Sequence, residues 1–210
     1  MRRASTRELQ RASQRAFRWL SPPGRTSGER LALCELGRLL CARIAQGAPG
    51  PRSVGTISAD LPTTGVFLRQ SREQLMSMLR QIALAPSMPL PGGAEARRCW
   101  AELFGALAAS YARSGDVAAV AAIVRAAAHL SLTDAWLDEA HAWLLDQQAA
   151  AGHFGLVSRE LAHLRADDRE GCDEDVLLRL TVEVLWAICE IVAARSQRRG
   201  RNIGVVEAAA

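Results

Sequence analysis

The chain has 210 residues, of which 49% are hydrophobic and 23% are charged, and this is enough apolar material for the core of one soluble domain. All 26 basic residues are arginine, which excludes enzymes that need a lysine, such as pyridoxal phosphate enzymes and P-loop nucleotide hydrolases. The net charge of +4 is too small to indicate a nucleic-acid-binding protein.

The first 46 residues predict a hairpin of two helices. Ser5 and Glu8 have the spacing of a capping box at the start of the first helix. Four arginines share one side of that helix: Arg7, Arg11, Arg15 and Arg18. Such a basic amphipathic helix is able to bind anionic lipid or an acidic partner, although we expect a solvated face on a helix that packs by its apolar edge. A second helix, rich in leucine, ends at Gly47.

The domain organisation follows from where the helical periodicity stops. Residues 47–64 lack periodicity, so we expect a loop there between the N-terminal hairpin and a helical core over 65–196. Together 1–196 form a single all-helical domain, and we expect 197–210 to be a disordered tail. The most hydrophobic run, 177–194, is interrupted by Arg179, Glu183 and Glu190, so no membrane span is expected.

Four helices with short joints are predicted between residues 99 and 164. The first carries five apolar side chains at helical spacing: Trp100, Leu103, Phe104, Leu107 and Tyr111. Gly115 and Asp116 end this helix and cap the next, so the two are antiparallel neighbours. The second helix is rich in alanine, and we expect other helices to enclose it. With Gly152 as a further joint, the chain predicts an all-α fold of about seven to eight helices in stacked antiparallel hairpins.

One segment, AHAWLLDQQAAAGHFG over 140–155, carries a recognisable pattern. Its pattern residues are Ala140, Trp143, Leu144, Gln147, Gln148, Gly152, Phe154 and Gly155. The pattern resembles the α/α-hairpin repeat signature of the terpenoid cyclase and protein prenyltransferase superfamily. The resemblance implies helical hairpins, arranged as a repeat or a partial toroid bundle. Ala151 stands where that superfamily usually has aspartate, and its aspartate-rich motif and zinc ligands have no clear counterpart, so the resemblance carries fold and no activity.

The acidic stretch at 165–175 is the candidate metal site. Asp167, Asp168, Asp173 and Asp175 carry the carboxylates that a hard cation such as Mg²⁺ prefers. Acidic residues at the start of a helix also stabilise it through the helix dipole, and this is the role we expect before the last helix. The sequence therefore predicts no metal and no cofactor.

Three polar residues are the catalytic candidates. Asp138 and His141 lie one turn apart and can form a hydrogen-bonded general base, and His153 lies in the turn after them. A pocket at this turn would be lined by five residues: Trp136, Trp143, Gln147, His153 and Phe154. No nucleophile elbow, HExxH motif or phosphate loop accompanies them.

These observations favour a non-catalytic helical partner protein that binds a peptide or protein, with an accessory role in bacterial secondary metabolism. A second copy of the chain, forming a homodimer, is a further partner that the sequence allows. Five cysteines without a CxxC pair, and no apolar run of signal-peptide length, predict a cytoplasmic protein with buried thiols. The alternative is an enzyme with a helical cavity that processes a small molecule and is related to the α/α-toroid cyclases.

Overall fold

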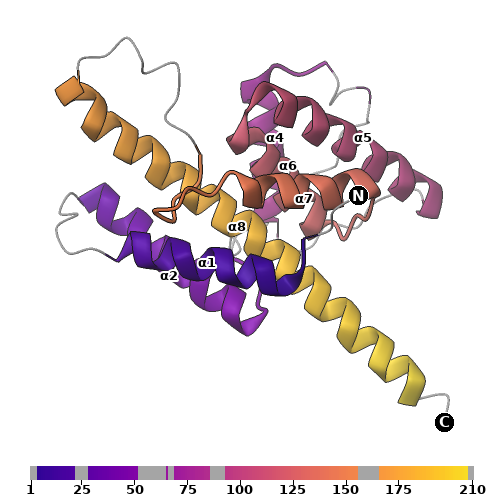
Figure 1. The fold of residues 1–210 in the computed structure, drawn as a ribbon. Helices are drawn as coiled ribbons and strands as arrows, with labels where there is room; N and C mark the ends of the chain where they lie inside the picture. Colours follow the sequence, from indigo (N-terminus) through magenta and orange to yellow (C-terminus); the bar gives the residue numbers. More distant parts are fainter. Residues whose placement is uncertain are drawn as a thin grey trace.

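The computed structural model describes residues 4–21, 28–51, 65, 69–85, 93–155 and 166–207, and in the last range it describes the side chains of 174–197. These residues form seven α-helices and no strand, which confirms the all-α prediction. The helices are α1 (Thr6–Leu20), α2 (Gly28–Gln46), α4 (Arg72–Leu84), α5 (Gly93–Ser114), α6 (Val117–His129), α7 (Ala135–Asp146) and α8 (Ala166–Glu207). Figure 1 shows α8 as a long rod, with α1 and α2 against one part of it and α4, α5 and α6 grouped on the other side.

Side-chain caps fix where the helices begin. The main-chain N–H of Ser5 donates to Glu8 Oε2 at 2.7 Å, and Ser5 Oγ accepts from the N–H of Glu8 at 3.2 Å, so the predicted capping box is present. Ser71 and Gln74 form the same reciprocal pair at the start of α4. Each box satisfies N–H groups that have no partner inside the first turn.

The joint between α5 and α6 is built as the sequence predicts. Gly115 has a φ of +76°, a conformation that a glycine adopts without strain, and Asp116 caps α6 by accepting from the N–H of Ala119 at 3.0 Å. Asp116 also accepts two hydrogen bonds from Arg72, which attaches α4 to this joint. Burial raises the pKa of Asp116, but the bonds from Arg72 and Ala119 outweigh it and hold the pKa below its usual value.

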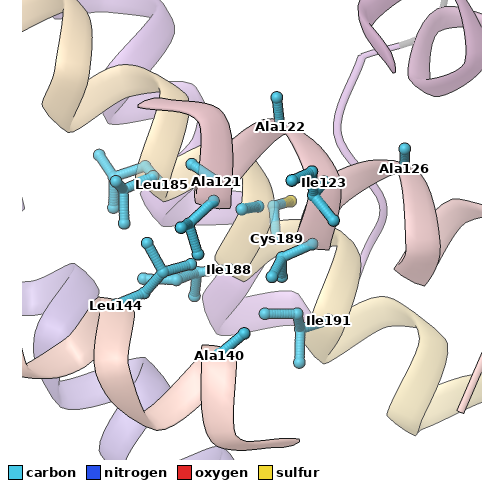
Figure 2. Close-up of a cluster of buried hydrophobic side chains, with 14 of the residues drawn as sticks. Ala121, Ala122, Ile123, Ala126, Ala140, Leu144, Leu185, Ile188, Cys189 and Ile191 are labelled. Atoms are coloured by element: carbon cyan, nitrogen blue, oxygen red, sulfur yellow. The ribbon is translucent and has the colours of Figure 1, made fainter. Parts of the chain in front are cut away.

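Helix α6 is the centre of the core. From Ala119 to Ala127 every residue is buried, and α6 contacts α4, α5, α7 and α8, so the expectation of an enclosed helix is confirmed. Figure 2 shows Ala121 and Ile123 of α6 beside Leu185 and Cys189 of α8, with Leu144 of α7 close by. Alanine at most α6 positions lets four neighbours approach closely, since a small side chain keeps the helix surface flat.

Helix α8 differs from its prediction at both ends. It begins at Ala166, inside the acidic stretch that was expected to precede it, and it continues to Glu207, through most of the range expected to be a tail. Residues 166–207 contain no proline, which would interrupt a helix. Acidic residues near the N-terminus of a helix interact favourably with its dipole, so the acidic stretch is compatible with the first turns of α8. No helix in the described part of the chain is long and apolar enough to cross a membrane. The fourth helix expected after Gly152 falls on 156–165, outside the described residues.

Candidate functional site

The predicted pair of Asp138 and His141 is brought together on α7, and a third residue joins it. Asp138 Oδ1 lies 3.6 Å from His141 Nδ1 and 3.6 Å from Arg195 Nη2 of α8. Arg195 Nη2 is also 3.4 Å from His141 Nδ1, while its Nη1 donates to the carbonyl oxygen of Ala4 at 2.7 Å. The cluster therefore ties α7, α8 and the start of the chain together. Sequence reasoning missed Arg195 because it lies far away along the chain.

The third catalytic candidate, His153, lies against α1. Its ring meets Trp19 edge-on, with ring centroids 5.4 Å apart. Beside it, Gln148 Oε1 accepts from Arg15 Nε at 2.8 Å, and Gln148 Nε2 donates to the carbonyl oxygen of Ala12 at 2.8 Å. The turn over 147–155 therefore docks on one side of α1 by a ring contact and two hydrogen bonds.

The residues that resemble the cyclase repeat signature build this turn. Gln148 and Phe154 form an isolated antiparallel bridge, and the N–H of Gly155 donates to the carbonyl oxygen of Gln147 at 3.0 Å. Gly152 and Gly155 have φ values of +109° and +89°. Phe154 is fully buried, and its N–H donates to Thr181 Oγ1 of α8 at 3.0 Å. In this chain these residues close a turn between α7 and α8.

The five residues predicted to line a pocket have different surroundings. Phe154 belongs to the core, His153 contacts Trp19, and Trp136 is 53% exposed with its Cβ packed towards Gly105. Trp143 is half-buried at the edge of the core, and Gln147 caps the end of α7.

Of the four aspartates proposed for a metal, one has a described side chain. Asp175 Oδ1 accepts from Arg30 Nε at 2.5 Å, which ties the start of α8 to α2. Asp167, Asp168 and Asp173 lie in the first turns of α8, and their side chains fall outside the described part. Within that part, no group of three histidine, cysteine or acidic residues has the spacing to hold a metal ion.

A charged cluster joins α4, α6 and α8, with a buried arginine on one side of a partly buried carboxylate and a half-exposed arginine on the other. Arg125 of α6 is 3% exposed, with its guanidinium carbon 3.7 Å from the ring centroid of Trp186 and Nη1 3.4 Å from Glu183 Oε2. Arg80 of α4 reaches the other oxygen of Glu183 at 3.1 Å. Two arginines around one carboxylate compensate for its burial, so this cluster joins three helices.

A cavity of about 500 Å³ lies between α1 and α2, which sequence reasoning did not predict. We call it the α1/α2 groove, and its lining residues are Gln10, Ser13, Gln14, Phe17, Arg18, Cys41, Ala42 and Ala45. Cys41 Sγ donates to the carbonyl oxygen of Ser13 at 3.3 Å, and burial raises the pKa of this thiol to about 12. The thiol is therefore an unreactive part of the groove at neutral pH.

Large apolar side chains are exposed on the two helices that form the groove. Of the five exposed large hydrophobic residues in the described part of the chain, three lie on α1 and α2: Phe17, Leu31 and Leu39, each 44–46% exposed. Phe17 lies in the lining of the groove, whereas Leu31 and Leu39 lie on α2 outside the lining. Comparisons of the chain with protein-family models, with curated proteins and with solved structures found no match.

Proposed function

We propose that the chain is a non-catalytic helical partner protein that binds a peptide or another protein. The observation that carries this proposal is the α1/α2 groove of about 500 Å³, where Phe17 remains exposed in the lining and Leu31 and Leu39 remain exposed elsewhere on α2. A soluble protein gains stability by covering such groups, and a partner helix or loop covers them on binding. Free cysteines that are buried as thiols, Cys34, Cys41 and Cys189, support a reducing, cytoplasmic compartment.

The catalytic candidates have interactions that explain their presence structurally. Asp138 and His141 share Arg195, which in turn holds the carbonyl oxygen of Ala4. His153 packs on Trp19. These contacts support roles in attaching α7 and its turn to α8 and α1.

An enzyme with a helical cavity is the second candidate. The 3.6 Å approach of His141 Nδ1 to Asp138 Oδ1 favours it, because a carboxylate orients a histidine that acts as a general base. Such an enzyme would lose turnover when His141 is changed, whereas a partner protein would keep its affinity.

The experiment compares these outcomes on the full chain. A photo-crosslinking amino acid placed at Leu39 captures partners from a native extract, and the same residue at Ala106, exposed on α5, is the control. A captured protein is then purified and titrated by calorimetry against wild type and His141→Ala. We expect saturable binding of equal affinity. A metabolite turned over by wild type and not by a folded His141→Ala variant would overturn the proposal.

A further inference from the structure

We propose that the α1/α2 groove binds an acidic amphipathic helix of a partner protein. This inference rests on the proposed function and gives the partner a chemistry. It is carried by the length of the exposed face of α2 from residue 31 to residue 45 and by the excess of arginine on α1 beside the groove.

The exposed face of α2 beside the groove is longer than the cavity itself, and it is apolar at its two ends with Glu35 and Arg38 between them. Ala42 and Ala45 line the groove, Leu39 lies one turn before Ala42, and Leu31 lies on the same side of α2 near its other end. From residue 31 to residue 45 this face of α2 extends about 21 Å, at 1.5 Å per residue, which is about four turns of a bound helix. A compact small molecule in the cavity would leave Leu31 and Leu39 uncovered. An amphipathic helix laid along the groove covers them with side chains at i, i+3, i+4 and i+7.

The charged residues around the groove predict the net charge of the partner. Arg18 lines the groove, and Arg7 and Arg11 are exposed on the same row of α1. On α2, Glu35 and Arg38 lie three residues apart on the face between Leu31 and Ala42, so their charges offset each other locally. The lining residues include one arginine and no carboxylate. The surroundings of the groove therefore carry an excess of positive charge, and carboxylates on the polar side of a bound helix complement this charge.

The same features argue against two other occupants. A membrane surface would require the apolar side of α1, but Leu9, Ala12, Ala16 and Leu20 are buried inside the protein. A second copy of this chain, packed groove to groove, would bring two sets of α1 arginines together and repel. An acidic helix covers the exposed apolar groups without either difficulty.

The test uses synthetic peptides, because the partner is unidentified. The probe is a fluorescent 16-residue peptide with leucine at i, i+3, i+4 and i+7 and glutamate at most other positions. One control has the same composition in scrambled order, and another has lysine in place of glutamate. Fluorescence anisotropy with the full chain should give a Kd on the order of 1–100 μM for the probe, rising with salt, and at least about tenfold weaker binding of both controls.

Variants locate the binding. Ala42→Glu places a carboxylate in the groove and should weaken binding of the probe by about tenfold or more, while Ala106→Glu, at an exposed position of α5, should have no effect. Arg11→Glu with Arg18→Glu should shift the preference towards the lysine peptide. Both alanines are exposed on helices, so these variants should fold.

Each contrary result has a definite meaning. No binding of the acidic probe, equal binding of the scrambled or lysine peptide, or full affinity in Ala42→Glu would overturn this inference. Binding to vesicles of anionic lipid that Ala42→Glu abolishes, or dimers that the same variant dissociates, would replace it with one of the rejected occupants. If the partner captured through Leu39 instead binds Ala42→Glu normally, the groove assignment fails while the proposed function stands.

Discussion

Replacing Gly152 by alanine should loosen the attachment of α1 to the rest of the protein. Gly152 has a φ of +109°, and a Cβ there would lie 2.5 Å from the carbonyl oxygen of Arg15 and 2.9 Å from its carbonyl carbon. Both atoms are main chain, so they cannot rotate away, and either the turn or α1 must move. A shift of either the turn or α1 disturbs the hydrogen bonds that Gln148 makes to Arg15 and Ala12.

The magnitude follows from two contributions. A non-glycine residue at positive φ costs about 1–2 kcal/mol. Forcing an extra carbon against a packed main chain costs about 1–3 kcal/mol more. We therefore expect Gly152→Ala to lower the free energy of unfolding by about 3.5 kcal/mol, the middle of the range of about 2–5 kcal/mol that the two contributions give together. Gly115→Ala is the matched control, because Gly115 has a φ of +76° but nothing within 4 Å of the added carbon, so it should lose only about 1–2 kcal/mol.

Urea unfolding of the full chain, followed by circular dichroism, measures both variants. A third variant, Gly28→Ala, has neither a positive φ nor a neighbour within 4 Å and should be neutral or more stable by about 0.5 kcal/mol. If Gly152→Ala and Gly115→Ala lose the same stability, the turn over 147–155 does not press on α1, and the docking described above is wrong.

Three further predictions concern the core, the thiols and pH. Arg125→Met should lower the free energy of unfolding by about 2–3 kcal/mol in urea, because Glu183 loses one of its two cations, and Glu183→Gln in the same background should recover part of the loss. In native protein at pH 8, mass spectrometry after iodoacetamide should find Cys99 alkylated and Cys41 unmodified, since burial raises the pKa of Cys41 to about 12; alkylation of both would contradict its burial. The folded state holds the pKa of Asp116 below its usual value, so its stabilisation is present above that usual value and is lost as pH falls through the folded pKa. Unfolding midpoints between pH 2 and pH 6 should fall less steeply in Asp116→Asn than in wild type, and parallel curves would refute this.

The elements that the sequence predicts well are those with local signals. The capping box at Ser5, the Gly115 joint and the apolar spacing from Trp100 each act within a few residues, and the structure has them where the pattern puts them. The start of α8 was harder, because an acidic run suits both the approach to a helix and its first turns. Nothing in the local pattern around Asp175 separates the two.

The candidate site was less predictable because distant segments build it. Asp138 and His141 are one turn apart and visible in the sequence, but Arg195 joins them from another helix. The α1/α2 groove depends on how α1 and α2 pack, and alanines such as Ala42 have no pattern that separates a groove from an exposed helix face. The residues of the resembled signature indicated a turn, and the contact of that turn with α1 required the structure.

Helix α1 connects the turn to the groove. The turn over 147–155 holds α1 at Ala12, Arg15 and Trp19, while Gln14 and Phe17, on another side of the same helix, line the groove. A change that shifts α1 away from the turn must therefore change the shape of the groove. Without urea, at a temperature at which both variants are folded, Gly152→Ala should weaken binding of the acidic peptide several-fold. Gly115→Ala should bind this peptide as tightly as wild type, although it is also less stable. Equal affinities in the two variants would show that the groove keeps its shape without the support of the turn.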